Sequence, residues 1–136
     1  THEQTPVKLT VLVHSAPYSS EAAYSAYRFT SSALAAGHEI YRLFFYYDGV
    51  HNSNASSTPP QDEFDLVKAW SELIKTHKLD AISCVSSALR RGVLDPQEAA
   101  RYEKEAASMG AQFVLSGLGQ LVDANTNSDR VMSFGA

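Results

Sequence analysis

Short apolar runs alternate with amphipathic segments along the whole chain. The apolar runs are rich in β-branched and aromatic residues and are bounded by turn residues, which favours buried strands. Between them, apolar side chains recur at helical spacing, as at Phe64, Val67, Trp70 and Ile74. The pattern predicts strands over 7–14, 38–47, 81–85, 112–115 and 130–134, and helices over 21–36, from 62 onward, and over 86–91, 96–109 and 118–124.

Capping residues set the limits of these predicted helices. The turn 15–20 supplies a serine N-cap for the first helix, and Asp62 is expected to cap the second. Asp95 and Glu98 form a capping box with proline between them at the first helical position, and we expect that helix to continue to about Met109. Three helices are then expected to end at a glycine: Gly37, Gly92 and Gly110.

Strands that alternate with helices through the whole length predict an α/β fold. We expect a single-domain, three-layer sandwich in which helices flank a mostly parallel sheet; the sequence leaves the strand order open. The loops at the carboxyl ends of such strands form the site. This geometry places 15–20, 48–61, 84–92 and 116–119 along one edge of the sheet.

Two neighbouring segments are candidates for contact with a partner or ligand. Four consecutive aromatic residues, Phe44 to Tyr47, put large rings on both faces of a strand, which suits a strand covered on both sides or one that meets a partner subunit. The segment 48–61 is the longest predicted loop, and such loops in compact domains are often functional.

Composition narrows the class of protein. The chain has 136 residues, of which 44% are apolar and 19% charged, with a net charge of -4. This balance predicts a globular domain over 7–136 after a tail at 1–6, and it argues against a general nucleic-acid-binding surface. No apolar run approaches the roughly 18 residues of a membrane span. The single cysteine excludes an internal disulfide and a cysteine-based zinc cluster, and it fits a reducing, cytoplasmic setting.

That cysteine, Cys84, is the main candidate for chemistry. A lone cysteine on an apolar strand is often structural, because a free thiol packs as a small hydrophobe. Cys84, however, ends its predicted strand on the site edge, and a helix follows whose start favours a thiolate. Arg90 and Arg91 add positive charge within two turns. On spacing alone, an inert thiol and a nucleophile are equally supported.

Other candidates are weaker. His14 ends the first strand and would reach the same edge, but a histidine that marks where a strand meets water is the simpler interpretation. The remaining histidines lack metal-ligand spacing. Gly117 and Gly119 follow a strand and open a helix, as in a phosphate-binding turn, but the third glycine and the acidic partner of that motif are missing.

Several blocks of sequence together resemble the DsrE family, and within it the TusD branch. The blocks follow the family order from about Val7 to Phe134 and are specific only as a set. They are Phe44 to Val50 with Asn52 and Asn54, Asp62 to Val67 with Ala69 and Trp70, Cys84 to Val93, and Leu115 to Gly119.

The resemblance implies a cytoplasmic sulfurtransferase subunit. Its relatives assemble with TusB-like and TusC-like sister subunits into a heterohexamer that holds two copies of each. They accept sulfur as a cysteine persulfide from a TusA-like donor and pass it to a TusE-like acceptor, for the 2-thiouridine of the tRNA wobble position. Cys84 matches the persulfide-carrying cysteine, with Arg90 and Arg91 in support. No cofactor, metal, membrane or direct nucleic-acid contact is implied.

Three alternatives stay open, of which a small-molecule-binding protein at the Gly117 turn ranks third. The first is the DsrE subunit of a DsrEFH complex in dissimilatory sulfur oxidation, because Thr58 to Asp62 resembles that branch more closely. The second is a non-catalytic module that binds a partner and in which Cys84 is structural.

Overall fold

The computed structural model describes residues 6–135, in which five parallel strands form one sheet. All five predicted strands are present, and the predicted parallel α/β fold is confirmed. The order across the sheet is β4-β3-β2-β1-β5, so the first strand lies in the interior as its apolar sequence requires. The strands are β1 (Lys8–Val13), β2 (Glu39–Phe45), β3 (Ala81–Cys84), β4 (Val114–Ser116) and β5 (Arg130–Phe134).

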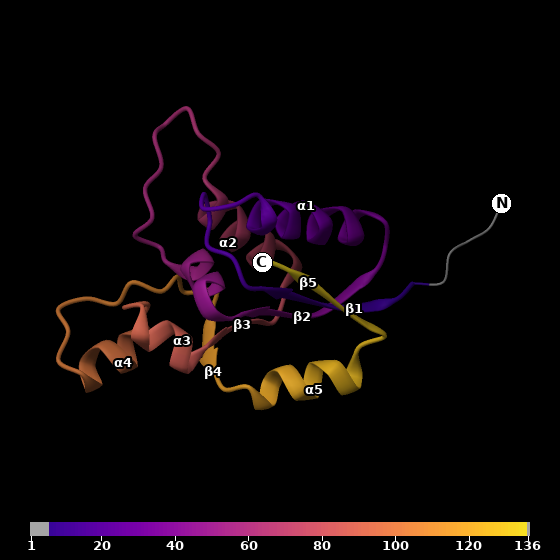
Figure 1. Ribbon diagram of the computed structural model, residues 1–136. Coiled ribbons are helices and arrows are strands. Elements are labelled where there is room, and N and C mark those ends of the chain that lie inside the picture. The colour runs from indigo at the N-terminus through magenta and orange to yellow at the C-terminus, as the bar shows by residue number, and fades with distance from the viewer. Residues whose placement is uncertain (1–5, 136) are drawn as a thin grey trace.

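Helices on both faces of the sheet make the predicted three layers (Figure 1). Helices α1 (Ala22–Ala35) and α2 (Leu66–His77) lie together on one face, and α5 (Gly119–Asn127) lies on the other. Two shorter helices, α3 (Val85–Arg90) and α4 (Pro96–Arg101), lie at the end of the molecule next to β4. The tail predicted at 1–6 falls, except for Pro6, outside the described residues.

The core is divided by the sheet into a large and a small cluster. Successive strand residues face opposite sides, so Phe45 packs under α1 and α2 with Trp70, whereas Phe44 packs on the other side with Ile82 and Cys84. Both phenylalanines are completely buried. The prediction that this aromatic run has rings on both faces is confirmed for these two residues, and the strand ends at Phe45.

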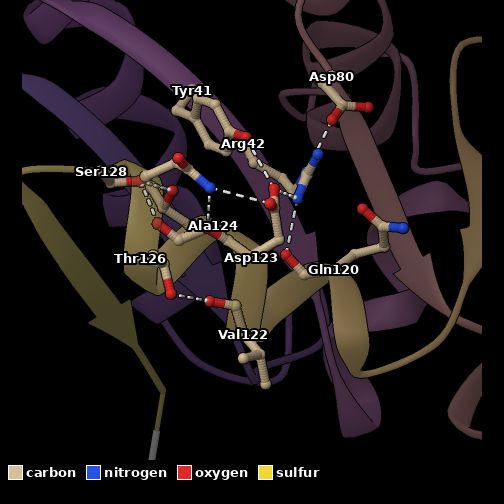
Figure 2. A network of polar contacts seen from close by, with 11 residues as sticks. Tyr41, Arg42, Asp80, Gln120, Val122, Asp123, Ala124, Thr126 and Ser128 are labelled. Carbon is tan, nitrogen blue, oxygen red and sulfur yellow. Dashed lines mark hydrogen bonds and ion pairs between the residues drawn. The ribbon is translucent and has the colours of Figure 1, made fainter.

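A charged cluster attaches α5 to the sheet (Figure 2). Arg42 of β2, only 9% exposed, donates from Nε to Asp80 (2.7 Å) and from Nη1 to Asp123 (3.0 Å) and to the Gln120 carbonyl oxygen (2.7 Å). The Tyr41 hydroxyl donates to the same Asp123 carboxylate at 2.7 Å. Because the guanidinium satisfies two carboxylates and a helix carbonyl, its burial is compensated and the position of α5 on this face is fixed.

The predicted start of α2 is wrong by several residues. The helix begins at Leu66, and its cap is Asp65, whose side chain accepts a hydrogen bond from the Lys68 N–H. Asp62, the predicted cap, lies in the turn before it. The first apolar residue of the helical pattern, Phe64, therefore precedes the helix and is half exposed.

The fourth predicted helix is confirmed at its start and wrong at its end. The Asp95 side chain accepts from the Glu98 N–H at 2.8 Å, as the capping box requires. The helix stops at Arg101, however, because Glu103 takes a left-handed conformation (φ 57°) that turns the chain. Met109, the predicted last residue, instead pairs with Asn54 in an isolated bridge. The segment 102–113 is thus used to return the chain to the sheet edge.

The predicted loop 48–61 begins as a 3-10 helix, η1 (Tyr47–Ser53). Gly49 permits this path, because a Cβ atom at that position would meet the carbonyl oxygen of Val13. The Ser83 hydroxyl in β3 hydrogen bonds with the Ser53 hydroxyl at 2.9 Å, which ties the helix to the sheet. The serine cap predicted for α1 is shifted too: Glu21 takes that position, and the Ser20 hydroxyl accepts from the Ala22 N–H.

Candidate functional site at the carboxyl edge of the sheet

Since the sheet is parallel, all its carboxyl ends lie at one edge, and the predicted loops gather there. Cys84 is the last residue of β3 and the capping position of α3, so the chain turns from strand to helix at this residue. Gly92, with φ 74°, ends the turn after α3 as predicted. The strand-to-helix delivery of Cys84 to the site edge is therefore confirmed.

The thiol of Cys84 is covered. The residue is 2% exposed and belongs to the small core cluster with Phe44 and Ile82. Leu121 of α5 and Tyr46, the residue just after β2, pack against this cluster from outside. Leu12 packs against the same cluster, and a partner molecule needs the packing around this buried residue to open before it can reach the sulfur.

Two tyrosines and a histidine lie above the end of β2. The rings of Tyr46 and Tyr47 are 4.0 Å apart between centroids, and the ring of His14 stacks on Tyr47 at 6.3 Å. Tyr47 takes a left-handed conformation (φ 50°), which is rare for a bulky side chain, and its N–H donates to the Ser87 hydroxyl at 3.1 Å. A strained, half-exposed aromatic residue at a sheet edge is a marker of a functional surface.

The electrostatics connect these tyrosines to the thiol. The pKa of Tyr46 is raised, first by its side-chain hydrogen bond with Tyr47 and by desolvation. The nearby Cys84 adds to the rise, and the positive charge of Arg90 opposes it. The Tyr46 hydroxyl therefore lies within the electrostatic reach of both Cys84 and Arg90.

The two predicted arginines have different surroundings. Arg90 is exposed and lies with Leu94 and Tyr102 around a surface hollow beside α4. Arg91 instead donates from Nε to Asp48 of η1 at 2.8 Å and from Nη1 to the Ser87 carbonyl oxygen at 3.2 Å. This pair lowers the pKa of Asp48 and links η1 to α3. Within residues 6–135 only Arg91 of the two forms an ion pair, and Arg90 lies at the end of α3 opposite to the one that Cys84 caps.

Asn52 organises the edge from the inside. It is completely buried, and its Nδ2 donates to the carbonyl oxygens of Ser15 (3.0 Å) and Gly49 (2.8 Å). Its Oδ1 accepts from Trp70 Nε1 at 3.1 Å. One amide thereby joins the loop after β1, the helix η1 and α2 at the base of the site.

Sequence patterns did not single out Tyr46, Ser87 or Asn52 for these roles. The run of aromatics marked Tyr46 and Tyr47 only as a possible interface, and nothing in the pattern showed that the second pair leaves the strand. Asn52 was noted only as part of a family block. The spacing of residues along the sequence does not show that a buried amide will hydrogen bond to three separate elements.

Of the weaker candidates, His14 does reach the site edge, where its ring stacks on Tyr47, whereas the glycine turn and a metal site receive no support. A Cβ atom added at Gly117 or Gly119 would meet no other atom within 4 Å, and neither residue has a positive φ, so neither space nor backbone conformation requires glycine there. Within residues 6–135, no group of three His, Cys, Asp or Glu side chains lies close enough to hold a metal ion. No helix in that same range is long and apolar enough to cross a membrane.

Comparison with known proteins places this arrangement in context. The model of the DsrE/DsrF-like family matches residues 7–134. The chain is 54% identical over 119 residues to the sulfurtransferase TusD homolog of Pseudomonas aeruginosa, an alignment that covers 88% of this chain and 91% of the relative. It is 46% identical over 129 residues to the putative sulfurtransferase DsrE of Allochromatium vinosum, with 95% and 99% covered.

A solved structure shares the fold at much lower identity. The crystal structure of the ychN protein from E. coli superposes with a TM-score of 0.76 at 18% sequence identity, covering 94% of this chain and 99% of that one. At this identity the likeness establishes the α/β architecture and nothing about the chemistry.

Proposed function

The chain belongs to the DsrE/DsrF-like family and is a sulfurtransferase of the TusD/DsrE type, and from this premise we propose that Cys84 carries the transferred sulfur as a persulfide. One observation carries the proposal: the only cysteine of the chain stands where β3 ends on the site edge and α3 begins. Helix α3 has only six residues, so its dipole makes a small contribution, and the proposal counts the exposed Arg90 as a second source of positive charge.

The reaction consists of two thiol exchanges. The Cys84 thiolate attacks the outer sulfur of a donor persulfide, the sulfur–sulfur bond of the donor breaks, and the donor leaves as a thiolate. An acceptor thiolate then attacks the outer sulfur of the Cys84 persulfide. The sulfur–sulfur bond on Cys84 breaks, the sulfur moves to the acceptor, and Cys84 is left as a thiolate. Each step conserves the oxidation level, so no external oxidant or reductant enters. A single cysteine suits a carrier, because a second thiol nearby would expel the sulfur as sulfide and close a disulfide.

The pathway follows the TusD branch of the family. A TusA-like protein donates the sulfur, a TusE-like protein accepts it, and the product is the 2-thiouridine of the tRNA wobble position. The chain acts in the cytoplasm within a heterohexamer that contains TusB-like and TusC-like subunits. The TusD homolog at 54% identity supports this choice, while DsrE at 46% lies within the 41–54% range of the TusD relatives, so the acceptor test below decides between the two pathways.

The test uses intact mass. The protein is incubated with a low-molecular-weight persulfide and its mass is measured before and after reduction. Wild type gains sulfur that dithiothreitol removes, and Cys84→Ser gains none while keeping the same circular dichroism spectrum. Equal sulfur uptake by both proteins would remove Cys84 from the mechanism. Transfer to a TusE-like acceptor, compared with a DsrC-like acceptor, separates the two pathways.

The burial of Cys84 favours a second candidate, a binding module in which the thiol is structural. Relay chemistry requires the packing around the sulfur to open, and Tyr46, which follows β2 at the site edge, is the residue packed against this cluster that lies outside the strands and helices. Under the relay proposal, Tyr46→Ala raises the alkylation rate of native Cys84 toward the rate in urea, and Tyr102→Ala, at an exposed tyrosine that ends α4, leaves it unchanged. A native thiol that stays inert in wild type, in Tyr46→Ala and in the presence of the sister subunits would establish the structural role.

A further inference from the structure

A groove of about 500 Å³ opens between the start of α1 and the segment that leads into α2. Its walls come from the connections that follow β1 and β2, which are neighbours in the sheet, so the groove lies at the same carboxyl edge as the candidate site. It is on the face covered by α1 and α2, whereas Cys84 is on the face covered by α5. The lining residues are Tyr18, Ser20, Glu21, Tyr24, Glu63, Phe64 and Leu66.

Aromatic rings form the walls of the groove. Tyr18, Tyr24 and Phe64 are 52%, 42% and 49% exposed, and the last two contact each other edge to face at 5.4 Å. The Tyr18 hydroxyl donates to the Phe64 carbonyl oxygen (2.9 Å) and accepts from the Leu66 N–H (3.0 Å). These bonds fix the Tyr18 ring at the wall and occupy its polar end, so the ring surface is what Tyr18 offers to an occupant.

The charged residues of the groove are all acidic. Of the described residues that line it, only Glu21 and Glu63 carry charge, and both are exposed. Electron-rich ring faces beside carboxylates attract an organic cation. The Tyr24 ring already has the guanidinium of Arg28 at 5.9 Å from its centroid, although Arg28 is not part of the lining.

We propose that this groove binds an arginine side chain presented by a partner polypeptide. Guanidinium is planar, stacks on aromatic rings and pairs with carboxylates through two N–H groups, which matches three rings and two glutamates better than the compact ammonium of lysine does. The groove is open and its rings are about half exposed, so a side chain can enter it while the backbone that presents the side chain stays outside. An arginine that protrudes from a polypeptide fits this geometry.

The site is independent of the sulfur chemistry, and it is tested by binding alone. The peptide acetyl-Gly-Arg-Gly-amide is titrated into the ¹⁵N-labelled protein, and the backbone amide shifts of residues 18–24 and 63–66 are followed. The matched probe replaces arginine by citrulline, which keeps the planar shape and removes the charge. We expect saturable shifts with the arginine peptide and about tenfold weaker binding of the citrulline peptide.

Variants locate the interaction. The double substitution Glu21→Gln and Glu63→Gln lowers the affinity for the arginine peptide about tenfold, and Phe64→Ala lowers it by a similar factor. Glu72→Gln, at an exposed acid of α2 outside the groove, leaves binding unchanged. Equal binding of both peptides, an absence of saturable shifts, or groove shifts that follow protein concentration alone and so indicate a second copy of the chain, would each overturn the proposal.

Discussion

Replacing Asn52 by alanine tests whether one buried amide holds the site edge together. The substitution removes three hydrogen bonds, those of the Asn52 amide with the carbonyl oxygens of Ser15 and Gly49 and with the Trp70 Nε1–H, and the last two of them are buried. A typical hydrogen bond contributes about 1 kcal/mol net, and each stranded buried group costs about 1–3 kcal/mol. Because some partners will find water after relaxation, we expect a loss of about 3–4 kcal/mol in the free energy of unfolding.

The measurement is equilibrium unfolding in urea, supported by the thermal midpoint. A loss of this size lowers the midpoint by roughly 10 °C in a domain of this length. The matched control is Asn54→Ala, which removes one hydrogen bond, from the Ser56 N–H, at a partly exposed position and should cost less than about 1 kcal/mol. Since Asn52 holds Gly49 of η1 in place, its loss should also loosen Tyr46 and Tyr47 and speed alkylation of Cys84.

A double-mutant cycle isolates the bond between Asn52 and the indole. Trp70→Phe keeps an aromatic ring and removes the Nε1–H donor, so the coupling between the two substitutions should be about 1 kcal/mol or more. A loss below about 1 kcal/mol for Asn52→Ala, or additive effects in the cycle, would refute the idea that this amide carries the local structure.

Two further predictions concern the scaffold. The pKa of Asp123 is lowered, first by the hydrogen bond from Tyr41 and then by that from Arg42, so the folded state binds this proton less tightly than the unfolded chain does. The ionised carboxylate therefore stabilises the fold above a pH of about 4, and this stabilisation is lost as the pH falls through the lowered pKa. Asp123→Asn should flatten the acid limb of a plot of unfolding free energy against pH. Gly49→Ala should fail to fold or lose more than about 2 kcal/mol, because the added Cβ meets a backbone carbonyl oxygen, whereas Gly117→Ala, in open space, should be tolerated in the same urea titration.

Local sequence was sufficient wherever the determining interactions are local. The Asp95 capping box and the turn glycines Gly37 and Gly92 act within a few residues, and each was predicted at its observed position. Apolar runs likewise predicted five strands and their shared carboxyl edge, so the position of Cys84 at that edge followed from pattern alone.

The misplaced helix ends show where local rules fail. Asp62 and Asp65 are both good caps, and the choice of Asp65 leaves Phe64 out of the helix as a wall of the aromatic groove. The pattern around Met109 is compatible with helix, but the chain needs that residue for the bridge to Asn54. In both cases a contact distant in sequence outweighed the small free-energy differences of helix propensity.

The amino-acid sequence therefore determined the fold class, the strand set and the presence of one cysteine at the end of a strand. Only the tertiary structure decided that this cysteine is buried in a cluster with Phe44 and Ile82, that Arg91 rather than Arg90 pairs with Asp48, and that Asn52 joins three elements. The reason is physical. The periodicity of apolar residues shows which face of a helix or strand is buried. Burial of a particular atom, ion pairs and amide hydrogen bonds depend on which helices and strands become neighbours, and the packing of the whole chain decides which do.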